Sequence, residues 1–174
     1  RWLGTKWMQD FIDKYAKVYD NLLKHDKSYP APQYLKSIVK VGNIDFEGEM
    51  DHDTEGSDYI KKLLLDNNPV PLHLQIWGGT NTVARALKSI EDEYKNTSQW
   101  KSIYNKVCDK ATIYIILDQD ETYKKYISVN WADINVVYNT AQFWSLAYGW
   151  IESVPSKMHS YLDGNWFAEN IRFN

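Results

Sequence analysis

The sequence predicts an α/β domain with a mostly parallel sheet flanked by helices. Three apolar segments, residues 72–77, 111–117 and 134–138, have the length and composition of strands. Helical patterns follow the first two, and strands that alternate with helices are typical of parallel sheets. The second segment is a continuous apolar run rich in β-branched residues, which predicts a strand buried on both faces. Three strands are few for a chain of 174 residues.

The stretch at residues 72–87 is the centre of this prediction. Gly78 and Gly79 follow the first strand and let the backbone turn tightly and approach a ligand, because neither carries a Cβ atom. Thr80 or Asn81 can cap the helix that follows. A strand that leads into a helix through a glycine turn builds ligand crevices in open α/β sheets. The same pattern also fits a purely structural turn.

Apolar spacing and breakers predict the helices before this stretch. From Thr5, apolar residues recur every three or four positions, which predicts an amphipathic helix of about 20 residues. Two prolines interrupt the pattern, and a short helix is expected over residues 33–41, ended by Gly42. Ser57 is expected to cap the next helix, which Asn67-Asn68-Pro69 ends.

After residue 87, further helices are expected between and beyond the strands. One begins at Ser98, one covers residues 122–128, and a short one lies near residues 166–172. The segment from residue 143 onward is otherwise aromatic and irregular. No internal repeat or linker divides the chain, so a single domain over residues 1–174 is expected.

Composition and charge exclude several classes of function. Twenty basic and 23 acidic residues give a net charge of −3, which offers no electrostatic support for nucleic-acid binding. The longest apolar run, residues 113–117, is too short to cross a membrane. Cys108 is alone, so no intrachain disulfide is possible. Aromatic residues make up 15% of the chain; such residues often line carbohydrate or nucleobase sites, or fill a large core.

An acidic stretch separates the second and third predicted helices. Seven titratable residues in this stretch could bind a cation or carry acid–base chemistry. More often such a run is a solvated loop, and this is the interpretation we favour. The residues are Asp45, Glu47, Glu49, Asp51, His52, Asp53 and Glu55.

Asp118 and Asp120 follow the second strand, at the edge where α/β sheets place their ligands. Paired carboxylates can hold a cation, orient a sugar hydroxyl, or act as acid and base when their pKa values differ. Alternatively, Asp120 caps a helix and Asp118 forms a turn, which requires no ligand.

The four histidines support no catalytic or metal site. His73 alternates with leucines within the first strand and is expected to be a core or interface residue. His25, His52 and His159 have no partner at the spacing of a metal site or a catalytic triad.

Several segments, taken together, resemble one family. The similarity rests on Asp53-Thr54-Glu55-Gly56-Ser57, Ile76-Trp77-Gly78-Gly79-Thr80-Asn81-Thr82 and Leu117-Asp118-Gln119-Asp120, with matches at residues 2–3, 15–18, 21–25 and 29–30. The sequence is similar to the nucleoside-hydrolase-like domain of secreted proteins often labelled cellulose-binding, found in polysaccharide-degrading microbes. The likeness spans nearly the whole chain in matching order.

The resemblance implies a doubly wound α/β fold like that of the N-ribosyl hydrolases. In those enzymes an aspartate cluster at the first strand holds a calcium ion, which binds the ribose diol and an attacking water. The backbone carbonyl of Trp77 would be a further calcium ligand, and Asp118 and Asp120 would be the catalytic carboxylates. The remaining implied substrate contacts come from Trp2, Glu55, Ser57, Trp77, Gly78, Gly79, Asn81 and Gln119.

The sequence also departs from the family pattern. The Asp-rich first-strand motif is absent because the sequence starts after its place, and the chain stops just before an expected His-containing segment. Gly79 stands where the true hydrolases have proline. We therefore expect an incomplete domain whose flanking parts are missing at both ends. Its partners would be other segments of the same protein or a β-rich C-terminal domain, and calcium would be held only in the full-length protein.

Two functions from different classes follow as expectations. The first is hydrolysis of glycosidic or N-glycosidic bonds, with water activated by a cation or a carboxylate. The alternative is a non-catalytic carbohydrate (cellulose)-binding module, in which aromatic rings stack on sugar. A purely structural domain is a third option. In each functional case the ligand is a carbohydrate or a nucleoside-like molecule, and the resemblance implies a secreted, extracellular or periplasmic protein.

Overall fold

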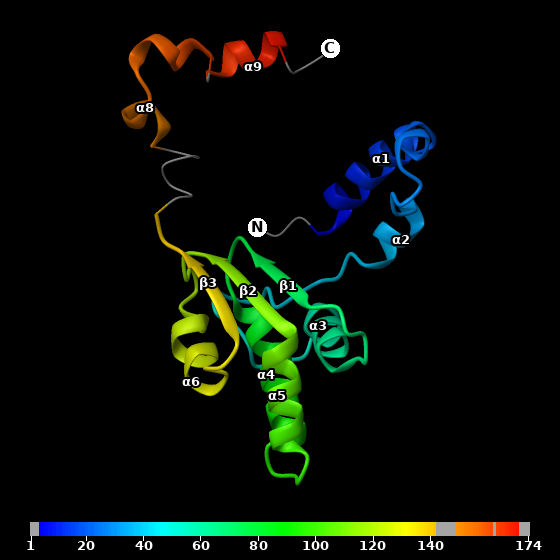
Figure 1. Ribbon diagram of the computed structural model, residues 1–174, viewed down its shortest axis with the longest axis vertical. Helices are drawn as coiled ribbons and strands as arrows, with labels where there is room; N and C mark the ends of the chain where they lie inside the picture. The colour runs from blue at the N-terminus through cyan, green and yellow to red at the C-terminus, as the bar shows by residue number, and fades with distance from the viewer. Residues whose placement is uncertain (1–3, 142–148, 162, 171–174) are drawn as a thin grey trace.

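The computed structural model of the protein describes residues 4–141, 149–161 and 163–170. It is an α/β structure in which helices pack against one open, parallel sheet (Figure 1). This confirms the predicted fold class. Trp2, an expected substrate contact, lies outside the described residues.

Three strands form the sheet in the order β1-β2-β3. They are β1 (Leu72–Ile76), β2 (Ala111–Ile116) and β3 (Asn135–Asn139). Both pairs are parallel, and Leu74 lies opposite Ile113, which lies opposite Val136. The first two strands begin where the sequence predicts, and β3 is displaced by one residue. All three carboxyl ends therefore meet at one edge of the sheet.

The helices before β1 differ from the prediction mainly at their ends. Helix α1 (Lys6–His25) has the expected length, whereas α2 (Pro32–Ser37) ends before the expected Gly42. Helix α3 (Glu55–Leu65) is capped by Thr54 rather than by Ser57. Ser57 is the third residue of the helix and completes a reciprocal capping box with Thr54, so the helix begins earlier than predicted.

The remaining helices follow the predicted alternation with the strands. Helix α4 begins directly after Thr80, and α5 leads without a loop into β2. The segment after β2 is helical as expected, but its first turn is a π-helix. The elements are α4 (Asn81–Tyr94), α5 (Trp100–Lys110), the π-helix η1 (Tyr123–Ile127), α6 (Ser128–Asn130), α8 (Trp150–Ser153), the 3₁₀ helix η2 (Ser156–Tyr161) and α9 (Gly164–Asn170). No helix of the described ranges combines the length and apolarity that spanning a membrane requires.

The core lies between one face of the sheet and the helices. Ala84, Leu87 and Ile90 of α4 are fully buried and share a cluster with Ile113 and Ile115 of β2. The apolar face of this helix is therefore the packed face. Helix α3 contacts both α4 and α5.

The opposite face of the sheet is open among the described residues. His73 and Gln75 of β1 are exposed, and Thr112 and Tyr114 of β2 are only half-buried. Of the two positions predicted for His73, the core is wrong, whereas an interface stays a prediction. Strand β2 is fully buried on one face only. The physical reason is that α4 and its neighbours cover the face of Leu74, while alternate residues of a strand point the other way.

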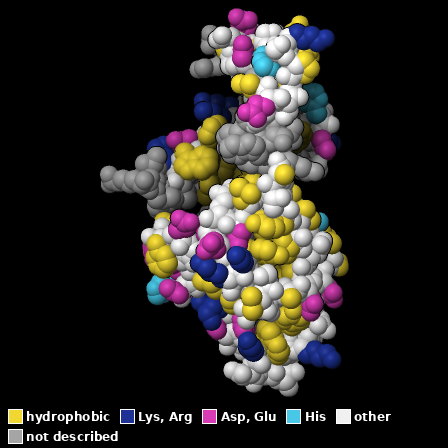
Figure 2. Space-filling model, turned by 90° about the vertical axis from the view of Figure 1, so that its left-hand side faces the viewer, with side chains coloured by type: hydrophobic (Ala, Val, Ile, Leu, Met, Phe, Trp, Pro, Cys, Tyr) yellow, Lys and Arg dark blue, Asp and Glu magenta, His cyan; other side chains and the backbone are white. Residues whose placement is uncertain are grey.

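Apolar side chains also remain exposed at the β3 edge and on α1. Val129 of α6 and Val137 and Tyr138 of β3 are exposed, and hydrophobic side chains gather on this side of the molecule in Figure 2. Helix α1 has no buried residue, and Trp7 and Phe11 on it are exposed.

Candidate functional site

A cleft of about 560 Å³ lies at the carboxyl edge of the sheet. The loop at residues 43–48 forms one side, and the turns that follow β1 and β2 form the other. The cleft brings together four of the predicted site residues, Gly79, Asn81, Gln119 and Asp120. Its lining is completed by Asn43, Ile44, Phe46, Glu47 and Gly48.

The Asp120 carboxylate joins the two turns of this edge. It is buried and accepts hydrogen bonds from the Asn81 backbone N–H (3.0 Å), the Thr80 hydroxyl (3.2 Å) and the Thr122 N–H (3.1 Å). The N-cap Thr80 makes no side-chain capping bond to its own helix. Asp120 therefore supplies the cap of α4 from the following strand's loop, where a negative charge also complements the helix dipole.

Asp118 caps a different helix. Its two oxygens accept the backbone N–H groups of Tyr123 (3.1 Å) and Lys124 (2.9 Å), at the start of η1. Asp118 does not line the cleft of Asp120; it lines a separate hollow of about 430 Å³ beside Tyr138. The structural alternative is thus seen in an extended form: Asp120 caps a helix as expected, although it is the preceding α4, and Asp118 both closes a turn through its carbonyl oxygen and caps the helix that follows.

The backbone around these carboxylates is strained. Leu117 and Glu121 have φ values of 60° and 58°, in the left-handed region that non-glycine residues rarely adopt. They flank the Asp118-Gln119-Asp120 segment on both sides. The left-handed residues turn the chain sharply after β2, and this brings Asp120 back toward the turn after β1.

Gly79 is required where the two turns meet, whereas Gly78 is not. A Cβ atom added to Gly79 would lie 2.3 Å from Asp120 Oδ2, a distance that real structures exclude. A Cβ on Gly78 would meet no atom within 4 Å. On the other side of the cleft, Gly48 has a φ of 77°, and its Cβ would lie 3.1 Å from the Asp120 carbonyl oxygen. The close approach of Asp120 thus explains why residue 79 is a glycine.

Asn81 holds the facing loop in place. Its side-chain amide donates to the carbonyl oxygens of Asn43 (3.0 Å) and Glu49 (2.9 Å), and Thr82 Oγ1 accepts the Asn43 N–H (2.9 Å). The first turn of α4 therefore fixes both ends of the loop at residues 43–49. Both amide hydrogens of Asn81 are used inside the protein.

Six of the seven titratable residues of the acidic stretch are exposed, as expected of a solvated loop, but Glu49 is buried. Its side chain is only 2% exposed, and it accepts hydrogen bonds from Asn43 Nδ2 (2.9 Å) and the N–H groups of Asp51 (2.8 Å) and His52 (3.1 Å). Burial raises the pKa of this carboxyl, but the hydrogen bonds from Asn43, His52 and Asp51 outweigh it and hold the pKa below its ordinary value.

The lowered pKa of Glu49 predicts acid sensitivity. A group whose pKa is lower in the folded state stabilises the fold above its unfolded pKa, and this contribution disappears as the pH falls through the folded pKa. We expect the unfolding temperature of the full-length protein to fall between about pH 5 and pH 3. Glu49→Gln should lower it at neutral pH and flatten this dependence, whereas the exposed Glu47→Gln should do neither. An unchanged slope in Glu49→Gln, measured by calorimetry across this range, would contradict the assignment.

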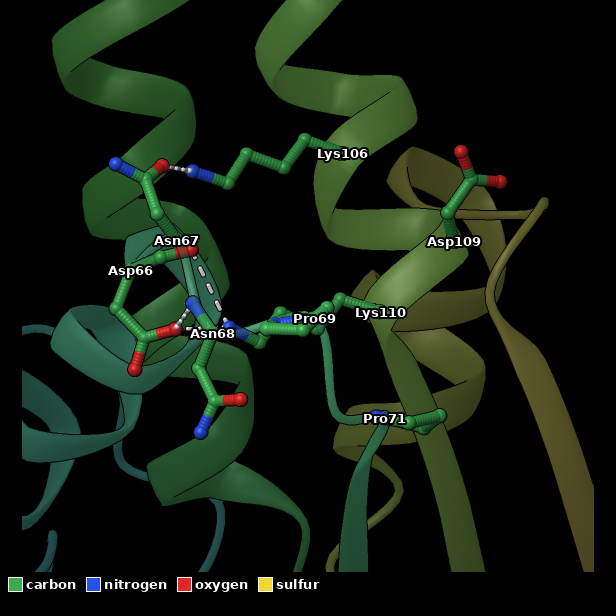
Figure 3. Close-up of a pocket in the computed structure, with 8 residues that line it drawn as sticks. All are labelled: Asp66, Asn67, Asn68, Pro69, Pro71, Lys106, Asp109 and Lys110. Atoms are coloured by element: carbon green, nitrogen blue, oxygen red, sulfur yellow. Dashed lines mark hydrogen bonds and ion pairs between the residues drawn. The ribbon is translucent and has the colours of Figure 1, made fainter.

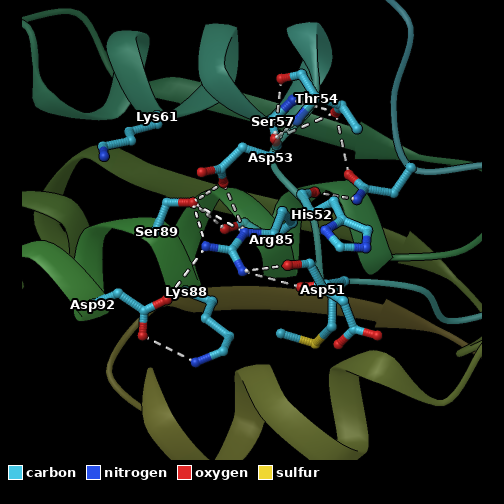
Figure 4. Close-up of polar contacts among 12 residues, drawn as sticks. Asp51, His52, Asp53, Thr54, Ser57, Lys61, Arg85, Lys88, Ser89 and Asp92 are labelled. Atoms are coloured by element: carbon cyan, nitrogen blue, oxygen red, sulfur yellow. Dashed lines mark hydrogen bonds and ion pairs between the residues drawn. The ribbon is translucent and has the colours of Figure 1, made fainter.

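Arg85 anchors the rest of the acidic stretch to α4 (Figure 4). The side chain is 7% exposed, and its Nε donates to Asp53 Oδ1 at 2.8 Å. Its guanidinium also donates to the carbonyl oxygens of Met50 (3.2 Å) and Asp51 (3.3 Å). The Ser89 hydroxyl, followed by the charge of Arg85, lowers the pKa of Asp53 against the effect of burial. The sequence analysis missed this residue, although a lone arginine inside the apolar run of α4 is an identifiable sign of a buried ion pair.

The other predicted residues lie around the cleft or outside it. The Trp77 ring is 72% exposed, and its backbone carbonyl accepts a hydrogen bond from Gln119 Nε2 at 3.2 Å, so Trp77 borders the cleft. Gly78 faces open space. Glu55 is exposed on α3, while Ser57 is buried in the capping box, and neither lines the cleft.

The described residues do not by themselves fit a calcium ion. They contain no group of three or more carboxylate, histidine or cysteine side chains placed to hold a metal. The Trp77 carbonyl is engaged by Gln119, and the oxygens of Asp118 and Asp120 accept N–H groups. Calcium needs about six or more oxygen ligands, so the further ligands would have to come from outside this set.

A second cavity lies at the opposite, amino edge of the sheet (Figure 3). Lys106 donates to the Leu65 carbonyl (2.6 Å) and to Asn67 (3.0 Å), and Lys110 pairs with Asp66. Because both ammonium groups already have partners, they tie α5 to the end of α3 and offer no free charge for a ligand. None of the predicted site residues lines this cavity.

Comparison with known proteins agrees with this architecture. The family described as "Cellulose-binding Sde182, nucleoside hydrolase-like domain" matches residues 2–174. A solved structure of a nucleoside hydrolase-related hypothetical protein from Saccharophagus degradans, described as associated with carbohydrate metabolism, is similar with a TM-score of 0.66 and 27% identity. The match covers 75% of this chain and 31% of that one, so this chain spans about a third of its structural relative. No curated protein matches the chain.

Proposed function

Since the chain belongs to the nucleoside hydrolase-like domain family of cellulose-binding Sde182, we propose that the cleft at the carboxyl edge of its sheet binds a carbohydrate. The observation that carries this proposal is the separation of the two carboxylates. Asp118 and Asp120 line different hollows, and each is committed to backbone N–H groups. Carboxylates held in this way form part of a rigid polar surface that can bind a ligand. They do not face one common point, as the acid and the base of a catalytic pair must.

The residues around the cleft suit a sugar ligand. Gln119 and Glu47 offer polar groups for hydroxyls. Trp77, whose backbone carbonyl accepts a hydrogen bond from Gln119, is exposed and next to the cleft. An aromatic face packs against the C–H groups of a sugar, and polar groups of the site fix its orientation. We propose an extracellular or periplasmic location, because a protein that binds cellulose meets it there. Other segments of the same protein, or a β-rich C-terminal domain, are the proposed partners.

The second candidate is hydrolysis of a glycosidic or N-glycosidic bond. It is favoured by the left-handed backbone of Leu117 and Glu121 around Asp118 and Asp120, because strain of this kind is found at active sites. In this case Asp118 or Asp120 would take a proton or a hydroxyl of the substrate. Calcium would take part only with carboxylates supplied by other segments of the protein.

Binding and turnover measurements on the full-length protein separate the two candidates. We expect Trp77→Ala to weaken binding to cellulose or cello-oligosaccharides about fivefold, because a stacked ring contributes roughly 1 kcal/mol. Trp7→Ala, also exposed but on α1, is the control and should bind normally. If the two variants bind equally well, the sugar does not stack on Trp77.

Turnover of glycosides and nucleosides by Asp118→Asn and Asp120→Asn tests the hydrolase. Loss of turnover with retained folding would favour hydrolysis, whereas full turnover in both variants would remove these carboxylates from catalysis. Calcium supplies a further measurement, because an ion bound to the native state must raise the unfolding temperature. No shift at millimolar calcium would favour the binding function.

A further inference from the structure

We propose that Phe46, with Ile44 beside it, is the platform on which a sugar ring stacks in this cleft, and that the cleft selects neutral over anionic glycans. This inference rests on the proposed carbohydrate function, and it identifies the class of glycan that the cleft prefers. Both side chains line the cleft and yet are exposed, Phe46 by 61% and Ile44 by 46%.

The backbone that carries Phe46 is fixed before any ligand arrives. The Glu49 N–H closes a turn on the Phe46 carbonyl at 3.2 Å, and the left-handed Gly48 packs this turn against the Asp120 backbone. The Asn81 amide holds the loop at Asn43 and Glu49. The backbone at Phe46 therefore needs little additional ordering when a ligand binds.

The surface of the cleft has the two kinds of group that a pyranose ring requires. Its apolar side is Ile44 and Phe46, and its polar side includes the Gln119 side chain at the end of β2. A pyranose has an apolar C–H face and a rim of hydroxyl groups. A flat ring beside hydrogen-bonding groups is complementary to that combination.

The charges of the lining identify the class of glycan. Glu47 and Asp120 are acidic, and no lysine or arginine lines the cleft among the residues that the structure describes. A uronate carboxylate or a phosphate placed here would meet like charge without a compensating cation. A neutral hexose polymer meets no such penalty, and it is the ligand for which this lining is suited.

The platform is tested by calorimetric titration of the full-length protein with cellohexaose. Phe46→Ala should weaken binding about tenfold, and Phe46→Tyr should restore most of it, because a phenol keeps the ring face. Phe11→Ala is the matched control, since Phe11 on α1 is the same residue with 60% exposure. Unfolding temperatures establish that each variant is folded. Wild-type affinity in Phe46→Ala, or equal losses in Phe46→Ala and Phe11→Ala, would overturn the proposal.

The charge selection is tested with the same protein and hexagalacturonate. The wild type should bind cellohexaose at least about tenfold more tightly than hexagalacturonate, and Glu47→Lys should narrow that ratio. Asp109→Lys makes the same charge change at the amino edge of the sheet and should leave the ratio unchanged. Preference for the uronate by the wild type would overturn the selection.

The failure of the proposed function and the failure of this inference give different results. If the wild type binds neither sugar, the proposed function itself fails. If the wild type binds cellohexaose and Phe46→Ala binds it equally well, only the platform is refuted.

Discussion

Replacing Gly79 with alanine should destabilise the protein by about 2–4 kcal/mol, because the added methyl group overlaps a buried carboxylate and displaces a helix cap. The new Cβ would lie 2.3 Å from Asp120 Oδ2. Relieving the overlap would move Asp120 off the Asn81 N–H and leave the start of α4 without its acceptor. Thermal and urea unfolding of the full-length protein measure the change.

Gly78→Ala is the matched control for this prediction. It is the neighbouring residue in the same turn, but its Cβ would meet no atom within 4 Å. Its effect should lie within about 0.5 kcal/mol of zero. Combining Gly79→Ala with Asp120→Ala should give less than the sum of the two single changes, since the closest contact is then gone. Equal stabilities of Gly78→Ala and Gly79→Ala would show that the two turns do not meet as described.

Loss of Arg85 should have an effect of similar size. Arg85→Ala is expected to cost about 2–3 kcal/mol, because it removes a buried donor that serves several acceptors at once. In this case Asp53 and the carbonyl oxygens of Met50 and Asp51 lose their donor (Figure 4). The acidic loop should then detach from α4, which limited proteolysis can detect alongside the fall in unfolding temperature.

Lys88→Ala provides the comparison on the same helix. Lys88 pairs with Asp92 at 3.0 Å, but the pair is largely exposed. Exposed pairs contribute about 0–1 kcal/mol, so this change should be small. If Arg85→Ala costs no more than Lys88→Ala, the loop is held by Glu49 and Asn81 without help from the arginine.

The arrangement of strands and helices could be predicted from the sequence because it depends on local pattern. The β-branched run of β2 and the three- and four-residue spacing of α4 report which side of each element is apolar. The edge of the sheet where the cleft lies is predicted by the parallel order of the strands. The ends of the helices are predicted less accurately: Thr54 caps α3, but Ser57, three residues later, is also of a residue type that caps helices.

The contacts of the site could not be predicted in the same way, because they join residues far apart in the chain. Asp120 caps a helix that begins 39 residues earlier, at Asn81. No local rule distinguishes this from a cap on the next helix, so the sequence predicts Asp120 as a cap without showing which helix it caps. A core or interface position is predicted for His73 because its strand neighbours are apolar, yet which face of β1 is covered depends on the position of α4.

The hydrogen bonds of Asp120 and Asn81 tie both sides of the cleft to the start of α4, and this limits how the cleft can move. Because the same helix start holds both walls, the opening cannot widen without fraying the first turn of α4. The cleft should therefore keep its shape when a ligand binds and should exclude ligands that are too bulky for it.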